Sequence, residues 1–424
     1  MNIMMMTNTY APHVGGVARS VDAFTQAYRR LGHKVLVVAP EFEDMPEHEQ
    51  DVVRVPALQH FNGSDFSVVL PVPGLLDEAI EAFAPELIHA HHPFLLGSTA
   101  LRLSRRLDLP LVFTHHTMYE QYTHYVPGDS ETLRRFVVNL STSYANLCDH
   151  IFAPSESVAD ILRERNVETP ITVIPTGVRL EEFDRGSGPG MRAVLDIPPD
   201  AFLVGHVGRL APEKNLEFLA RAVIAFMAAE PRAHFLLVGK GPSEKVVREA
   251  FVRAGLTSRL HMPGQLEGAM LASAYRAMDV FAFASQSETQ GMVLAEAMAA
   301  GVPVVAVDAP GCREVVRDRR NGCLLPAENE VTFAGALMWM SRLSPDERAG
   351  ILQEVRETAV AFSLERSVER AVGIYRELTL ERRLKKDSEA ELSGWSAALR
   401  MIRAEWDLLV GAATGSEHRE RPRQ

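Results

Sequence analysis

Short apolar runs alternate with amphipathic helical patterns along the first half of the chain. Helices are predicted over Val17–Arg30 and Gly97–Leu107. The predicted strands are Asn2–Met6, Lys34–Ala39, Glu86–Ala90, Leu111–Thr114, Ile151–Ala153 and Ile171–Ile174. Strands that alternate with helices are typical of a parallel, doubly wound sheet.

The same alternation restarts after a break at Pro175-Thr176-Gly177. Asp184–Gly190 is rich in Gly, Pro and Ser and is predicted to be a linker. Strands then follow at Phe202–Val207, Ala233–Val238, Val280–Ala282 and Pro303–Val307, with helices at Leu216–Ala229 and Gly291–Ala300. We therefore predict an α/β protein with two Rossmann-like, doubly wound domains facing a central cleft. Ligands should bind beyond the carboxyl ends of the strands.

Composition narrows the class of protein. The chain has 424 residues, 46% of them apolar and 23% charged, which is typical of a soluble globular protein with two domains. Its three cysteines are scattered, which favours a reducing compartment and argues against a zinc site. No apolar run approaches the ~20 residues of a membrane span, and Met1–Tyr10 lacks the pattern of a signal peptide. We therefore expect a cytoplasmic protein.

The net charge of −11 argues against broad nucleic-acid binding. The imbalance is concentrated before residue 179, where 12 Lys and Arg face 21 Asp and Glu. An acidic first half also counts against strong electrostatic attraction to anionic surfaces.

Two loops of the second half carry unusual chemistry. Arg209 and Lys214 flank a turn directly after a predicted strand, so two cations can converge on a diphosphate. The alternative is a solvated turn with two incidental bases. Glu288 and Glu296 lie eight residues apart around Gly291, whose following amides open a helix with its positive end toward an anion. Alternatively, Glu288 caps this helix and Glu296 is a surface residue.

These motifs resemble a known family. Gly-Arg-x4-Lys, followed by Glu-x7-Glu within Ser-Glu-Thr-Gln-Gly and Glu-Ala-Met-Ala-x-Gly-Val-Pro-Val-Val, is similar to the donor domain of family 4 retaining glycosyltransferases with the GT-B fold. The resemblance implies that Arg209 and Lys214 hold the donor diphosphate, that Glu288 contacts the transferred sugar, and that Glu296 contacts the ribose. The remaining implied donor contacts are Gly15, Gly16, Gly291, Met292 and Val293. Cys312 departs from the family pattern, which often has a second Gly there.

The resemblance also assigns roles in the first half. His116, at the end of Leu111–Thr114 and in a Thr-x-His-Thr setting, is expected to face the donor sugar, and histidine can carry charge near neutrality. The run that follows resembles bacterial enzymes that glucosylate diacylglycerol. It implies an acceptor site formed by Tyr119, Tyr122, His124 and Tyr125, although core packing is the ordinary role of any single tyrosine.

From the resemblance we expect a retaining, metal-independent glycosyltransferase that needs no cofactor. Its substrates would be a nucleoside-diphosphate hexose, of the UDP-glucose or GDP-mannose type, and an acceptor hydroxyl such as that of diacylglycerol. A soluble or polysaccharide acceptor, and hydrolysis or epimerisation of a nucleotide sugar, remain alternatives. The predicted domains are 1–178 for the acceptor, 179–360 for the donor, and a helical return at 361–385.

The tail, 386–424, is predicted to hold an amphipathic helix and a polar end. Its apolar seam repeats at alternating spacings of three and four and consists of Leu392, Trp395, Leu399, Ile402, Trp406 and Leu409. This helix could pack on the body, dimerise or touch a membrane. Arginines at 102, 105, 106, 134 and 135 could also face anionic headgroups at the inner face of the cell membrane.

Overall fold

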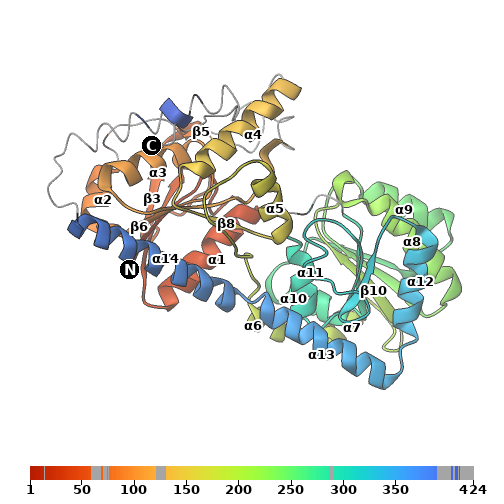
Figure 1. Cartoon of the computed structure of the whole chain (residues 1–424). Helices are drawn as coiled ribbons and strands as arrows, with labels where there is room; N and C mark the ends of the chain where they lie inside the picture. The colour runs from red at the N-terminus through yellow and green to blue at the C-terminus, as the bar shows by residue number, and fades with distance from the viewer. Residues whose placement is uncertain are drawn as a thin grey trace. The chain divides into compact units, whose positions relative to one another are not determined.

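The computed structural model describes residues 1–13, 15–58, 76–120, 130–285 and 290–388, together with positions 68, 69, 74, 288, 403, 406–408 and 410. The chain forms two compact units (Figure 1). The first unit contains Met1–Thr176 and the chain from Val368 onward, and the second contains Gly177–Ser367.

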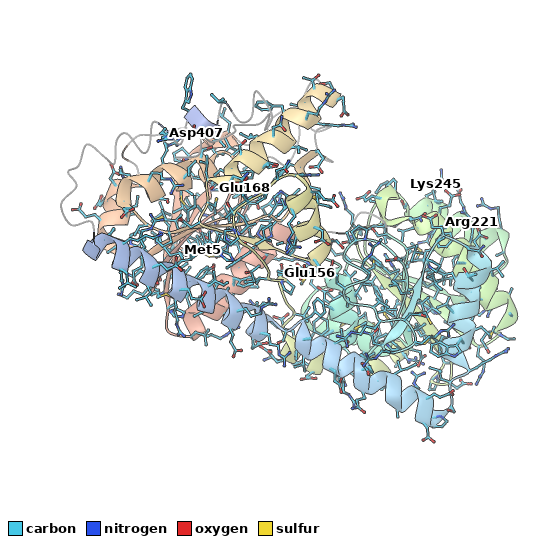
Figure 2. All side chains as sticks on the ribbon, in the orientation of Figure 1. Met5, Glu156, Glu168, Arg221, Lys245 and Asp407 are labelled. Atoms are coloured by element: carbon cyan, nitrogen blue, oxygen red, sulfur yellow. The ribbon has the colours of Figure 1, made fainter. Side chains whose placement is uncertain are left out.

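The first unit is built on a seven-stranded sheet in the order β3-β2-β1-β6-β7-β8-β9, with every pair parallel. The strands are β1 Asn2–Met6, β2 Lys34–Pro40, β3 Val52–Val55, β6 Leu87–Ala90, β7 Leu111–Thr114, β8 His150–Ala153 and β9 Ile171–Val173. A small antiparallel pair joins β4 Ala57–Leu58 to β5 Val68–Val69. Met5, labelled in Figure 2, is fully buried, because a parallel sheet is covered on both faces.

Two helices of the first unit are capped by a serine side chain. Ser130 accepts a hydrogen bond from the Leu133 amide at the start of α4, and Ser155 accepts one from Val158 at the start of α5. The helices are α1 Gly16–Arg30, α2 Asp77–Phe83, α3 Leu96–Leu107, α4 Glu131–Asn146 and α5 Glu156–Glu164.

The second unit has a six-stranded parallel sheet in the order β12-β11-β10-β13-β14-β15. The strands are β10 Phe202–Val207, β11 Ala233–Val238, β12 Leu260–Gly264, β13 Val280–Phe283, β14 Val304–Val307 and β15 Gly322–Leu325. This is the Rossmann order, in which the direction of winding reverses between β10 and β13. The first sheet reverses in the same way between β1 and β6. The prediction of two doubly wound sheets is therefore confirmed.

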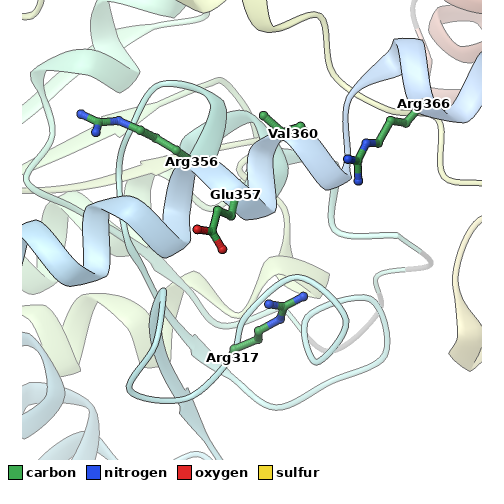
Figure 3. Close-up of a pocket in the computed structure, with 5 residues that line it drawn as sticks. All are labelled: Arg317, Arg356, Glu357, Val360 and Arg366. Atoms are coloured by element: carbon green, nitrogen blue, oxygen red, sulfur yellow. The ribbon is translucent and has the colours of Figure 1, made fainter.

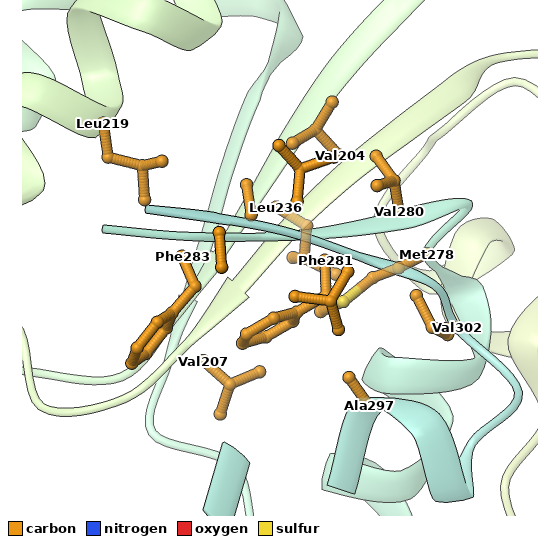
Figure 4. Close-up of a cluster of buried hydrophobic side chains, with 14 of the residues drawn as sticks. Val204, Val207, Leu219, Leu236, Met278, Val280, Phe281, Phe283, Ala297 and Val302 are labelled. Carbon is orange, nitrogen blue, oxygen red and sulfur yellow. The ribbon is translucent and has the colours of Figure 1, made fainter. Parts of the chain in front are cut away.

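The core of the second unit lies on both sides of its sheet. Phe281, Phe283 and Leu236 pack with Met278, and Ala297 of α11 also faces this cluster (Figure 4). The covering helices are α8 Leu216–Ala229, α9 Glu244–Arg253, α10 Gly268–Ala277, α11 Met292–Ala299, α12 Glu330–Ser341 and α13 Pro345–Ala361. Ser344 and Glu347 form a capping box at the start of α13.

The linker predicted at Asp184–Gly190 is wrong, because this segment is part of the second unit. Helix α6 runs over Leu180–Asp184, and α7 runs over Gly188–Val194 with Ser187 as its cap. A Cβ on Gly188 would lie 2.3 Å from the carbonyl oxygen of Arg276, so this glycine permits close packing on α10. The glycines of this segment therefore allow close packing and do not make it a flexible linker.

Helix α14, Leu364–Ser388, carries the chain back to the first unit. Arg382 pairs with Asp108 and Asp149, at 3.0 and 2.7 Å. The Tyr375 hydroxyl lies 3.0 Å from that of Tyr28 on α1. Within the described residues, no helix is both long and apolar enough to cross a bilayer.

Candidate active site

Lys214 and Glu288 form an ion pair in the second unit. Lys214 ends the 3₁₀ turn η3, Pro212–Lys214, which follows β10, and Glu288 follows β13. Both side chains are mostly buried, with 21% and 17% of their surface exposed. The Ser285 hydroxyl donates to the Glu213 carbonyl at 3.2 Å and so ties the two loops together. The β10 and β13 carboxyl ends flank the point of reversal, where open α/β sheets bind ligands.

Arg209 lies in the same loop but does not join this pair. Its side chain is 61% exposed and pairs with Glu213, four residues along. Of the two predicted diphosphate ligands, the structure therefore holds Lys214 in place and leaves Arg209 at the surface. Its predicted contact to phosphate stays a prediction.

Gly291 and Gly311 let two loops of the second unit approach closely. Gly291 is the N-cap of α11 with φ +67°, and a Cβ there would lie 2.7 Å from the Gly311 carbonyl oxygen. The N-cap position of α11 is occupied by Gly291, so the alternative role of Glu288 as its cap is wrong. The first-turn amides of a helix have no partner within it, which leaves those of Met292 and Val293 available to an anion.

Glu296 and Cys312 lie behind this site. The Tyr275 hydroxyl of α10 donates to the Glu296 carboxylate at 2.7 Å, which fixes this predicted ribose ligand. Cys312 is fully buried, so its thiol is accommodated where the family often has glycine. Burial, together with the charges of Glu288 and Asp308, raises the pKa of the Cys312 thiol to about 12. The thiol is therefore neutral.

His206 of β10 is a site residue that the sequence reasoning missed. Its ring stacks with Phe281 and Phe283, and Nδ1 donates to the Ala282 carbonyl at 3.0 Å. Nε2 is buried and has no partner in the described ranges of the chain, and burial lowers the pKa of His206 to about 4. A Cβ on Gly208, at the start of the loop that leads to Lys214, would lie 3.5 Å from His206 Nε2, so this ring borders the loop of the candidate site. A histidine inside an otherwise apolar strand was the available signal.

The first unit places histidines at the carboxyl ends of β6 and β7. His91 Nδ1 lies 2.9 Å from His116 Nε2. His89 is held by Thr114, 2.7 Å from Nε2, and by Tyr375, 2.7 Å from Nδ1. Burial lowers the pKa of His116 well below its usual value. His116 therefore stays uncharged near neutrality, because burial disfavours the protonated imidazole. Its predicted contact with the donor sugar stays a prediction.

The loop after β1 is bound to the start of α3. Asn8 donates from its backbone to His92 Nδ1 at 3.1 Å, and its side chain accepts from the Leu96 amide. Gly15 is the N-cap of α1 without a side-chain cap bond, and Gly16 is the first helical residue, with open space beside it. These two predicted phosphate contacts thus lie at a helix start, as their role requires.

Only one of the predicted acceptor residues belongs to the described part of the chain. Tyr119 is buried between Phe94 and His115, with ring centroids 5.3 and 5.6 Å away, and within the described part of the chain its hydroxyl has no partner. Next to it, Glu120 pairs with Arg165 at 2.7 Å. The other three predicted acceptor residues, Tyr122, His124 and Tyr125, lie outside the described residues.

Some of the arginines and apolar residues that were predicted to contact a membrane are exposed, and others have partners within the protein. On α3, Arg105 bonds the Leu147 carbonyl and Arg106 pairs with Asp77, so both have internal partners. On α4, Arg135 and Phe136 are exposed. The predicted seam of the tail lies outside the described residues except for Trp406, which is 64% exposed.

A separate surface pocket of the second unit contains none of the predicted site residues. It is lined by Arg317, Arg356, Glu357, Val360 and Arg366, from the loop after β14, from α13 and from the start of α14 (Figure 3). Across the residues that the structure describes, no group of three or more His, Cys, Asp or Glu side chains is arranged to hold a metal ion.

Comparison with known families matches both halves of the chain. Residues 14–182 match the model described as Glycosyltransferase Family 4, and residues 201–342 match that of Glycosyl transferases group 1.

Several named enzymes are similar in sequence. The alpha-monoglucosyldiacylglycerol synthase of Streptococcus pneumoniae is 28% identical over 360 residues, which cover 84% of this chain and 81% of that enzyme. The GDP-mannose-dependent alpha-mannosyltransferase of Mycobacterium tuberculosis is 30% identical, and the match covers 76% of this chain and 83% of that enzyme. The D-inositol 3-phosphate glycosyltransferase of Saccharomonospora viridis is 32% identical, covering 69% and 70%.

Solved structures give the same fold. HepE of Anabaena, in complex with UDP and glucose, has a TM-score of 0.67 at 21% identity and covers 89% of this chain and 99% of its own. The sucrose-phosphate synthase of Thermosynechococcus elongatus has a TM-score of 0.69 at 22% identity, covering 90% and 100%. The predicted GT-B fold is confirmed by these likenesses.

Proposed function

This chain belongs to glycosyltransferase family 4, and we propose that it transfers a hexose, with retention of configuration and without a metal ion, from a nucleoside diphosphate to a lipid hydroxyl. That it is a glycosyltransferase follows from its membership. The observation that carries the donor part of this proposal is the Lys214–Glu288 pair at the reversal of the second sheet, beside the start of α11 at Gly291.

The second unit would bind the donor. Lys214 and the α11 amides would hold the diphosphate, Arg209 would swing onto it from the surface, and Glu288 would accept hydroxyl hydrogen bonds from the sugar. Glu296, already oriented by Tyr275, would accept from the ribose hydroxyls. The relative solved with UDP and glucose supports a nucleotide sugar as the donor.

In the proposed reaction, the bond from the sugar carbon C1 to the diphosphate breaks as the acceptor hydroxyl attacks from the same face. The diphosphate leaves with the bonding electron pair, and its β-phosphate accepts the proton of the acceptor. Lys214 and the helix amides stabilise the negative charge that develops there. These groups provide the stabilisation that a metal ion would otherwise supply.

We propose diacylglycerol, or a similar membrane lipid, as the acceptor. Two relatives carry the name alpha-monoglucosyldiacylglycerol synthase, one from Streptococcus pneumoniae and one from Acholeplasma laidlawii. On α4, the exposed Phe136 lies next to Arg135, whose exposed guanidinium is 3.7 Å from the Glu131 carboxylate, and an exposed ring beside a cation suits contact with a lipid surface. We expect this contact to be peripheral.

A soluble acceptor is the second candidate, because a relative at 32% identity is named for D-inositol 3-phosphate. The decisive experiment incubates the purified protein with UDP-glucose or GDP-mannose, each with diacylglycerol vesicles, inositol phosphate or no acceptor. We expect an α-linked glycolipid in EDTA-treated buffer and only slow release of nucleotide without acceptor. Rapid nucleotide release without acceptor would instead indicate a hydrolase, and a β-linked product would contradict retention.

A further inference from the structure

His91 and His116 form a hydrogen-bonded pair of imidazoles at the ends of β6 and β7. Their facing nitrogens, His91 Nδ1 and His116 Nε2, are 2.9 Å apart, and the rings are stacked with centroids separated by 5.2 Å and planes tilted by 22°. The His89 ring lies 4.2 Å from that of His91 and is itself held by Tyr375 and Thr114. The His91 ring therefore packs against a histidine whose own position is held by two hydrogen bonds.

A hydrogen bond between two neutral imidazoles contains one proton, so the two tautomers depend on each other. Burial keeps both rings neutral by lowering the pKa of each. If His91 Nδ1 carries the proton, His116 must accept at Nε2 and therefore carry its own proton on Nδ1. If His116 donates instead, its Nδ1 is bare and His91 must carry its proton on Nε2.

The buried end of His91 decides between these states. His91 Nε2 is buried and has no hydrogen-bond partner among the residues that the structure describes. A buried N–H without an acceptor is rarer in proteins than an acceptor left unpaired, so the His91 proton belongs on Nδ1. We propose that His91 is a positioning residue that holds His116 in the tautomer protonated on Nδ1.

This assignment gives His116 one chemical role. His116 is partly exposed, and its Nδ1 has no partner among the described residues, so this nitrogen presents an N–H group. An N–H group donates to an oxygen of the sugar or of the phosphate, and it cannot accept the proton of the acceptor hydroxyl. His116 thus orients the donor and is not a general base. The inference rests on the proposed function, because it assumes that His116 meets the substrate.

The test combines four variants with one spectroscopic measurement. His91→Phe keeps a stacked ring but removes the donor, and His91→Asn restores an N–H near the position of Nδ1. His234→Phe is the matched control, since His234 Nδ1 lies 2.9 Å from His261 Nε2 in the second unit, with centroids 5.2 Å apart. In the wild-type protein, ¹⁵N-histidine NMR reports which nitrogen of His116 is protonated, with the signal assigned by its loss in His116→Ala.

We expect His91→Phe to lower kcat about tenfold, the kinetic equivalent of one hydrogen bond, with less effect on the KM for the sugar nucleotide. His91→Asn should recover most of the rate, His234→Phe should match wild type, and the His116 signal should be that of the Nδ1–H tautomer. An Nε2–H signal overturns the inference even if His91→Phe fails to fold, and so does wild-type kcat in His91→Phe. If His116→Ala itself retains full transfer, the assignment of His116 under the proposed function fails as well.

Discussion

The Lys214 ammonium donates a hydrogen bond to the Glu288 carboxylate, so the loops after β10 and β13 are joined before any substrate is present. We expect Lys214→Ala to lower kcat/KM at least about 100-fold, because one lost donor to a developing charge typically has this effect. The measurement is steady-state transfer, with circular dichroism to check the fold. Arg221→Ala removes an exposed arginine of the same unit, paired with Glu217 and Glu330, and should leave the rate unchanged. Near wild-type turnover in Lys214→Ala would contradict the diphosphate role.

Arg209 should act mainly on donor binding, since its exposed side chain must move from Glu213 to reach a phosphate. We expect Arg209→Ala to raise the KM for the sugar nucleotide with a smaller change in kcat. Increasing salt from about 0.05 M to about 0.5 M should raise the wild-type KM more than that of the variant, because exposed charges are screened. Equal salt dependence of the two proteins would remove Arg209 from the phosphate site.

The close approach of Gly291 to Gly311 predicts a narrow tolerance at both positions. Gly291→Ala should lower the free energy of unfolding by about 1–3 kcal/mol, because φ is +67° and the new Cβ meets the Gly311 carbonyl. Thermal unfolding with and without UDP measures the effect. Gly335→Ala is the control, since Gly335 lies inside α12 with open space around its Cβ position and should be stabilised by up to about 1 kcal/mol. An unchanged Tm in Gly291→Ala would refute the close packing.

Buried neutral histidines should make stability depend on pH. Burial lowers the pKa of His89 and His92 to about 3 and that of His206 to about 4, below the 6.5 expected in the unfolded chain. Because the unfolded chain binds more protons in this window, stability is complete above pH 6.5 and falls as the pH drops toward 4. Each such histidine contributes a slope of up to about 1.4 kcal/mol per pH unit.

This slope is measured by Tm between pH 7.5 and pH 5, and His206→Phe should make it shallower while retaining the stack on Phe281. A Tm that stays constant across that range would contradict burial of these neutral rings.

Removing the Tyr375 hydroxyl should loosen α14 from the first unit. Tyr375→Phe keeps the ring but deprives His89 Nδ1 and the Tyr28 hydroxyl of their partner, and we expect about 1–3 kcal/mol of destabilisation. Hydrogen exchange of the α14 amides reports the loosening directly. Leu380→Ala changes an exposed residue on the same helix and should have little effect.

The central strands and the loops after them were predictable from the sequence, because their runs are mostly apolar even where a residue such as His206 interrupts β10. Of the four edge strands of the two described parallel sheets, β9 was predicted, but β3, β12 and β15 were not. Leu260–Gly264 contains proline and glycine, and Val52–Val55 contains Arg54, which edge positions tolerate but an apolar run does not show. The start of α7 is rich in glycine, and glycine in a sequence indicates a linker as readily as it indicates close packing, so the prediction of a linker there was wrong.

The candidate site, too, was predictable only in part. The identities of Lys214 and Glu288 followed from sequence, but their pairing, like the exposure of Arg209, depends on how two loops fold together. His206 could not be assigned a role, because its contacts with Phe281 and Ala282 come from a neighbouring strand far along the chain. The neutral state of His116 likewise depends on burial that only tertiary packing creates.

The first unit is assembled from two separate stretches, with the second unit inserted between Thr176 and Val368. A gene fragment that ends at Thr176 would therefore encode a polypeptide without Tyr375 and Arg382, leaving His89, Asp108 and Asp149 without those partners. A fragment spanning Gly177–Ser367 is contiguous and keeps its whole sheet. Only this second fragment should be obtained as an independently expressed domain, and split-protein or domain-exchange experiments should place their junctions accordingly.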